Sequence, residues 1–280
     1  MGTIAFQFLD LMALPSVRRS AIALLIAGVS MPVVGVFIIG LDVITVRFAV
    51  MHMALFGTAL GLWIGVDPTL MALGCCVLTG ASLAPAAERP GGLAGPMSFL
   101  MTVSAAGALL VLSISGVNAN GAFEILWGSI LAIRQQDLVL IVIAAVCVTA
   151  FALLAHRKVA LLLFDREIAK CSRVPVGTLT TGLLVLIALA IGSSIRVTGA
   201  LLVDSITLLP ALSARNLGSS LRSMAAWAIG LGLIGNTVGF VLALQLDVPP
   251  GPVLVLVAGA ITLATYLVPA HRRPAALRTH

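Results

Sequence analysis

Long apolar runs, separated by short polar stretches, dominate the hydrophobic pattern of this 280-residue chain. A helix needs about 20 apolar residues to cross the hydrocarbon core of a bilayer. The run at 198–212 is short and indicates a broken or partial span, and the apolar piece at 122–133 indicates a re-entrant segment. We therefore predict an all-α polytopic transmembrane bundle of about eight or nine helices, in a single domain covering residues 1–280. The predicted spans are 20–40, 49–66, 69–87, 97–116, 137–155, 177–195, 198–212, 222–244 and 252–270.

The composition supports a protein whose solvent is mostly lipid. Hydrophobic residues make up 60% of the chain and charged residues 9%, with a mean hydropathy of +1.18. A soluble domain carries about 25% charged residues, so this chain has too little charge to cover a surface facing water. Residues 4–16 are expected to form a short helix lying along the membrane surface.

The distribution of basic residues predicts the orientation. Arg and Lys flank the apolar runs, which favours membrane anchoring over nucleic acid as the reason for the net charge of +6. The loop 156–176 and the C-terminal tail are rich in Arg and Lys and should be cytoplasmic, whereas the acidic loops 66–68 and 245–252 should face outward. Arg18 and Arg19 would lie outside if there were nine full spans, against the rule, so the side of the N-terminus stays open.

Two ionisable residues lie inside apolar runs, where such groups are costly and usually functional. His52 follows the start of the second span, and Asp204 lies within the run at 198–212. An imidazole and a carboxylate suit Zn²⁺ or Mn²⁺. The alternatives are a packing histidine, an Asp204 paired with a hydroxyl or an Arg of the next helix, or a proton relay. Met51 and Met53 flank His52, and copper(I) is a minor alternative.

Other sequence features narrow the function. Neither a P-loop sequence nor a His-Glu-x-x-His motif occurs, so we expect the chain not to be an enzyme and not to bind ATP by a P-loop. The four cysteines show no Cys-x-x-Cys spacing and are expected to pack as small apolar residues. The remaining charged residues near the predicted spans are expected to mark their boundaries: Asp42, Arg47, Glu88 and Arg89.

Five segments carry a resemblance, in one order along the chain. MHMALFGTALG at 51–61 resembles His-Ala-Ala-Leu-x-Gly-x-Ala-Leu-Gly, and WGSILAIRQQDL at 127–138 resembles a Gly-Ser-Ile-Leu segment. FDREIAKCSRVPV at 164–176 resembles a Phe-Asp-x-Glu-x-Ala loop, and 246–258 resembles an Asp-x-Pro-x-Gly-Pro run. The stretch 198–222 resembles a Gly-rich helix followed by Pro-Ala and Ala-Arg. Together they make the chain similar to the zinc, manganese and iron-type ABC permeases, the ABC-3 family.

The resemblance implies a fold of the ABC-importer permease type and a multi-pass location in the bacterial inner membrane, among lipid. It implies an importer in which two permease copies, expected as a homodimer, form a pathway above two cytoplasmic ATP-binding subunits. An extracytoplasmic metal-binding protein would deliver the ion. ATP hydrolysis would belong to the partner. No permanently bound cofactor is expected, because the divalent metal is the cargo. The segment that would couple to the ATP-binding subunit carries Pro210, Ala211, Ala214 and Arg215.

The chain departs from the family pattern at one important position. Family members have an Asp one helical turn before the His, and this chain has Phe48 there. Asp204 occupies a position that is usually apolar in the family. We therefore expect that Asp204 replaces the missing carboxylate and that His52 and Asp204 form the metal site.

Two rival functions stay open from the sequence. One is an ABC permease for a metal chelate such as a siderophore or cobalamin, and the other is a proton-coupled secondary transporter with Asp204 as carrier. Such transporters often contain inverted repeats, and no convincing repeat occurs in this chain. The sequence leaves open whether Zn²⁺, Mn²⁺ or Fe²⁺ is carried, because a His and carboxylate set accepts all three.

Overall fold

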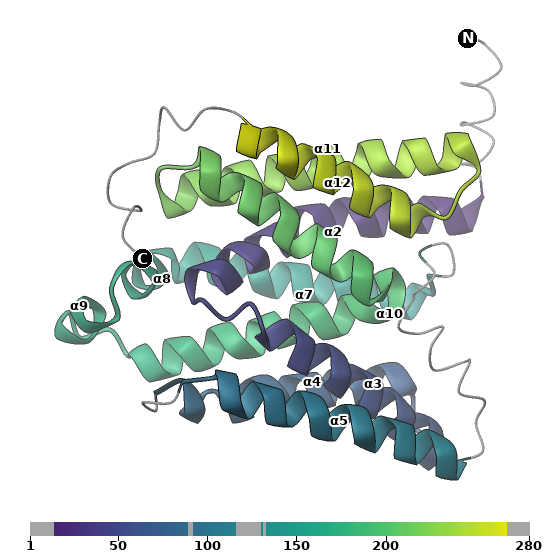
Figure 1. Ribbon diagram of the computed structural model, residues 1–280, viewed down its shortest axis with the longest axis horizontal. Coiled ribbons are helices and arrows are strands. Elements are labelled where there is room, and N and C mark those ends of the chain that lie inside the picture. Colours follow the sequence, from purple (N-terminus) through teal and green to yellow (C-terminus); the bar gives the residue numbers. More distant parts are fainter. Residues whose placement is uncertain (1–13, 89–91, 116–129, 131–132, 268–280) are drawn as a thin grey trace.

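The structure is a computed structural model that describes residues 14–88, 92–115, 130 and 133–267. The described residues form helices and connecting turns, with no strand among them, and Figure 1 shows the helices gathered into one bundle. This confirms the predicted all-α polytopic bundle. The helices are α2 (Pro15–Gly40), α3 (Val46–Ile64), α4 (Pro68–Leu83), η1 (Pro85–Glu88), α5 (Ala94–Ser115), α7 (Gln135–Leu154), α8 (His156–Phe164), α9 (Arg166–Cys171), α10 (Val176–Leu217), α11 (Leu221–Leu246) and α12 (Pro250–Leu267).

Local capping explains where several helices begin. Pro15 and Pro68 open α2 and α4, and proline suits the first helical turn because its missing N–H would have no helical partner there. The Asp67 carboxylate accepts hydrogen bonds from the backbone N–H groups of Thr69 and Leu70 at the start of α4. Ser220 caps α11 by accepting from the N–H of Ser223. These side chains satisfy N–H groups that a helix start leaves free.

Helix α10 turns back on itself. Its 42 residues would make a straight helix about 63 Å long. However, α10 starts just after α9, and beyond its end Arg222 contacts Nε2 of His156 in α8, so both ends of α10 lie near the α8–α9 segment. The reversal occurs at Gly199, whose backbone has φ 75° and ψ 161°. Figure 1 shows the two halves of α10 diverging from this point.

The reversal separates two stretches of α10. Eight of the described helices are long and apolar enough to cross a membrane, the first part of α10 among them. The half of α10 that follows Gly199 runs back along the bundle (Figure 1). The run predicted as a partial span at 198–212 is this returning half, which continues to Leu217.

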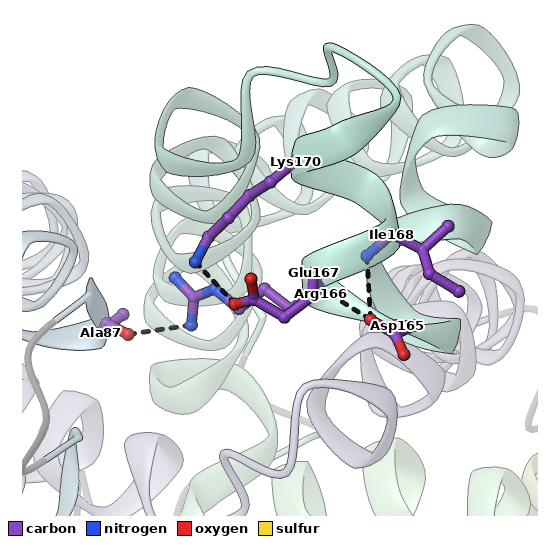
Figure 2. Close-up of polar contacts among 6 residues, drawn as sticks. All are labelled: Ala87, Asp165, Arg166, Glu167, Ile168 and Lys170. Atoms are coloured by element: carbon purple, nitrogen blue, oxygen red, sulfur yellow. Dashed lines mark hydrogen bonds and ion pairs between the residues drawn. The ribbon is translucent and has the colours of Figure 1, made fainter.

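The two ends of the bundle differ in charge. The predicted cytoplasmic loop folds into α8 and α9, beside the α10–α11 turn, and Arg166 of α9 donates to the carbonyl of Ala87 at 2.9 Å. Figure 2 shows this contact, together with the Glu167–Lys170 pair of the same helix. The start of α2, with Arg18 and Arg19, lies at the opposite end in Figure 1. This arginine pair therefore lies away from the basic loop.

Helix α10 lies at the centre of the core. It packs against α2, α3, α4, α7, α11 and α12, and Leu183, Leu184 and Ile187 of its first half are fully buried. Helices approach closely where glycine leaves room. A Cβ atom at Gly35 would lie 1.9 Å from the carbonyl oxygen of Thr207 in α10. Glycine is therefore required where α2 crosses the returning half of α10.

The outer helices expose apolar surface. Only 22% of the most apolar stretch of α5, 22% of that of α7 and 17% of that of α12 is buried within this chain. Large side chains such as Ile114, Leu154 and Leu256 are exposed on them. A water-soluble monomer rarely exposes so much apolar surface, so these helices face lipid or another membrane-embedded chain.

Three expectations fall outside the described residues. Most of the surface helix expected at 4–16 and most of the re-entrant piece expected at 122–133 are not described. The basic C-terminal tail, with Arg272, Arg273 and Arg278, is not described either. Ile130 is described, and its carbonyl accepts a hydrogen bond from the Ser20 hydroxyl of α2.

Candidate functional site

An ion pair joins α3 to the returning half of α10. Arg47, in the first turn of α3, has its Nη1 atom 3.3 Å from Oδ1 of Asp204. Asp204 lies five residues beyond the Gly199 reversal. The side chains are 15% and 26% exposed, so both are mostly removed from solvent. The pair supplies the compensating charge that a carboxylate in an apolar bundle needs.

An aromatic ring also holds Arg47. The guanidinium carbon lies 4.5 Å from the centre of the Phe48 ring, a cation–π distance. Phe48 stands at the position where the sequence lacks the expected carboxylate. The guanidinium therefore lies between a π-face on its own helix and a carboxylate on α10.

His52 lies one turn after Phe48 on α3 and is partly buried. Its Nδ1 atom lies 2.7 Å from the carbonyl oxygen of Phe48. A carbonyl only accepts hydrogen bonds, so Nδ1 carries the proton and donates it. In the neutral ring this leaves the lone pair on Nε2, which is the arrangement that a metal-binding histidine uses.

The two predicted metal ligands do not contact each other directly. Arg47 and His52 are five residues apart on α3, which separates them by about 7.5 Å along the axis and about 140° around it. Asp204 has its ion pair with Arg47, and no hydrogen bond or ion pair joins it to His52. Within the described residues, no group of three or more His, Cys, Asp or Glu side chains could hold a metal ion.

Arg47 is the residue that the sequence interpretation missed. It was expected to mark the boundary of a span, and it does lie at the start of α3. Its pairing with Asp204 was anticipated only as one alternative, an arginine on another helix. The signal was available in principle, because an isolated carboxylate in an apolar run needs a compensating cation.

The predicted coupling residues lie at the end of α10. The helix continues through Pro210 to Leu217, so the change of direction occurs after it, between Gly218 and Ser220. Ala211 and Ala214 are fully buried and pack with Val36 of α2 and Ala228 of α11. Pro210 is also buried.

Only the last of the four predicted coupling residues is exposed. Arg215 lies in the last turn of α10, where a cation complements the negative end of the helix dipole. Ser219, Ser220 and Arg222 are exposed next to it, around the turn into α11. This end of the bundle therefore offers a small polar and cationic surface above a tightly packed base of small residues.

Comparisons with known proteins bear directly on this arrangement. The sequence model of the ABC 3 transport family matches residues 13–268, which is nearly the whole chain. The chain belongs to the ABC 3 transport family. The resemblance seen in the five sequence segments is thereby confirmed.

Two relatives of this ABC 3 chain are named as membrane proteins of metal transport and uptake systems. The manganese transport system membrane protein MntC of Halalkalibacterium halodurans is 25% identical over 263 residues, covering 93% of this chain and 90% of the relative. The high-affinity zinc uptake system membrane protein ZnuB of Haemophilus influenzae is 25% identical over 229 residues, covering 79% and 85%. The chain is thus a multi-pass membrane protein of a transport family, and these relatives are named as membrane proteins of transport systems.

A solved structure supports the fold. The structure described as PsaBC from Streptococcus pneumoniae in complex with Fab matches with a TM-score of 0.82 at 22% identity, covering 96% of this chain and 98% of that one. The similarity extends over essentially the entire helical arrangement. It shows that this ABC 3 chain has the helical fold of that protein.

Proposed function

We propose that this chain is the membrane-spanning subunit of an ATP-driven importer that carries a divalent transition-metal ion, Zn²⁺, Mn²⁺ or Fe²⁺, into the cytoplasm. The observation that carries the proposal is the family match over residues 13–268, together with relatives named for manganese transport and zinc uptake. The chain has no P-loop, so the ATP-binding subunit is a separate partner. The other partners are a second permease copy, an extracytoplasmic metal-binding protein and the surrounding lipid.

His52 is the first proposed metal ligand. Its Nδ1 proton is engaged by the Phe48 carbonyl, which fixes the ring and leaves Nε2 for a metal ion. One imidazole does not complete a coordination shell, because Zn²⁺ takes four ligands. Asp204 is proposed as the carboxylate that contributes to this shell, and a second permease copy would supply further groups.

The exposed turn after α10 is proposed as the contact with the ATP-binding subunit. Arg215 would make the direct contact, because it is exposed in the last turn of the helix. Pro210, Ala211 and Ala214 would act indirectly, because they are buried and set how the end of α10 packs on α2 and α11. The ATP-driven movement would reach the pathway through the returning half of α10.

The proposal is tested by metal uptake into cells that lack their own metal importers. The permease is expressed with its ATP-binding subunit and binding protein, and radioactive Zn²⁺ and Mn²⁺ are followed in turn. We expect uptake that disappears when the P-loop lysine of the ATP-binding subunit is replaced, and that falls at least about tenfold with His52→Ala. Uptake that continues without a working ATP-binding subunit would contradict the proposal and favour a secondary transporter.

A further inference from the structure

The Arg47–Asp204 pair is an incomplete ion pair. An arginine that has a purely structural role commonly binds a carboxylate through two parallel hydrogen bonds. Here a single distance of 3.3 Å joins Nη1 to Oδ1. Nε of Arg47 is buried without a hydrogen-bond partner, and Oδ1 of Asp204 is buried without a hydrogen bond of normal geometry. The pair compensates charge but leaves much of the bonding capacity of both groups unused.

Among the residues whose side chains the structure describes, no further polar partner of the pair is found. The hydroxyl of Ser205, next to Asp204, is also buried without a hydrogen bond. The second contact of the guanidinium is the Phe48 ring. A π-face attracts a cation without a directional bond, so the Phe48 ring keeps the guanidinium nearby but does not define its orientation. Asp204 keeps 26% of its side chain exposed, although its Oδ1 atom, which lies 3.3 Å from Nη1 of Arg47, is buried.

We propose that Arg47 is a tethered cation that occupies the Asp204 carboxylate while the pathway is empty, and that the incoming divalent ion must displace it. Arg47 is then a residue that determines the affinity and ion specificity of the transport site. This inference rests on the proposed function, because it assigns to Asp204 a role in metal passage. It also explains how a carboxylate is kept in an apolar bundle between transport events without being left uncompensated.

Charge and distance favour a divalent ion as the displacing species. A metal ion coordinates a carboxylate oxygen at about 2.1 Å, compared with 3.3 Å for the guanidinium nitrogen. With twice the charge at the shorter distance, its attraction to the carboxylate is about three times that of Arg47 in the same medium. A monovalent ion lacks the doubled charge, so at the same distance its attraction to the carboxylate is half that of a divalent ion.

The pair also links the ion to movement of the helix. Asp204 lies between the Gly199 reversal and Arg215, which is eleven residues, or about 16 Å, further along α10. While the pair is closed, it holds this half of α10 against the start of α3. Displacement of Arg47 removes that tie at the same moment as the ion arrives.

The test measures binding of Mn²⁺ and Zn²⁺ to the purified full-length permease in lipid nanodiscs. If Arg47 occupies Asp204 for more than nine-tenths of the time, it weakens the apparent affinity about tenfold. We therefore expect Arg47→Gln to bind both ions about tenfold more tightly than the wild type. The double variant Arg47→Gln with Asp204→Asn should have the affinity of Asp204→Asn alone. Lys170→Gln, which removes a cation from the exposed Glu167 pair, is the matched control and should leave affinity unchanged.

A second variant covers the case in which Arg47→Gln does not fold. Phe48→Leu keeps both charges and removes only the ring that holds the guanidinium, and we expect it to tighten metal binding about threefold. Folded Arg47→Gln or Phe48→Leu protein with wild-type affinity would overturn the inference, as would a gain that persists in the double variant. If the wild type imports metal but these variants change nothing, only the inference fails. If the wild type neither binds nor imports metal, the proposed function fails with it.

Discussion

At the scale of single residues, a polar side chain buried in the membrane interior is costly unless it has a hydrogen-bond partner. Several hydroxyls do this locally: Thr58 donates to the carbonyl of Ala54, and Thr207 to that of Val203. Asn236 instead reaches another helix and donates to the carbonyl of Leu24 at 3.0 Å. Asp204 differs, because a carboxylate needs a cation as its partner, and Arg47 of α3 is that cation.

Gly35 offers a sharp test of the close packing between α2 and α10. Gly35→Ala would put a Cβ atom against the backbone carbonyl of Thr207, which cannot move aside as a side chain can. We expect a destabilisation of about 1–3 kcal/mol, seen as a lower midpoint of thermal unfolding in detergent. Gly74→Ala, in an open position on α4, is the control and should be neutral or slightly stabilising. Equal midpoints for Gly35→Ala and the wild type would contradict the packing.

The residue scale also shows what the sequence can and cannot predict. Asp204 and His52 were found because a charged or ionisable group in an apolar run is conspicuous. Arg47 was assigned to a boundary, because the sequence shows which group is costly but not which distant group compensates it. That choice depends on how the returning half of α10 lies against α3, and the reversal at Gly199 decides it.

At the scale of elements, the reversal within α10 is the most unusual feature. The backbone of Gly199 lies in a region that costs other residues about 1–3 kcal/mol. Gly199→Ala should therefore lower both thermal stability and ATP-dependent metal uptake. Gly230→Ala, at an open position in α11, is the matched control and should keep both. Normal stability together with normal uptake in Gly199→Ala would show that the reversal does not need glycine.

The exposed end of α10 carries the coupling prediction. Arg215→Glu reverses the charge of the last turn without touching the buried base of the turn. We expect it to lower uptake and metal-stimulated ATP hydrolysis by at least about tenfold, because a repelled contact does not transmit movement. Metal binding in nanodiscs should stay unchanged. Arg173→Glu, an equal charge reversal at an exposed position after α9, serves as the control. Equal losses in both variants would argue against a specific role for Arg215.

The end of α10 is a case in which tertiary packing outweighs the local preference of one residue. Proline cannot donate a backbone hydrogen bond to the preceding turn, so a helix commonly kinks or ends near it. The helix instead passes through Pro210, whose ring lies near Gly232 of α11, and ends at Leu217. Burial between α2 and α11 stabilises this last stretch and outweighs the one missing hydrogen bond.

At the scale of the whole molecule, the Arg47–Asp204 ion pair is mostly buried inside the bundle, whereas the exterior of the bundle is apolar. The outer helices α5, α7 and α12 expose apolar faces, while the charged pair lies between α3 and the central helix α10. The basic helices α8 and α9 and the Arg215 turn gather at one end, where a cytoplasmic partner would bind. The sequence predicted the all-α membrane bundle and the basic loop, because hydropathy and charge are local properties of the chain. It did not predict the central pair, which depends on the tertiary arrangement.

The most direct test of the importer uses proteoliposomes whose membranes contain only the purified permease and its ATP-binding subunit. The ATP-binding subunits face outward, ATP is supplied outside, and Mn²⁺ or Zn²⁺ is loaded inside with the binding protein. We predict that ATP drives the metal out of the lumen, towards the side of the ATP-binding subunits, and that His52→Ala reduces the rate at least about tenfold. Metal movement at the same rate without ATP, or none with ATP in a complex that hydrolyses it, would contradict a metal importer.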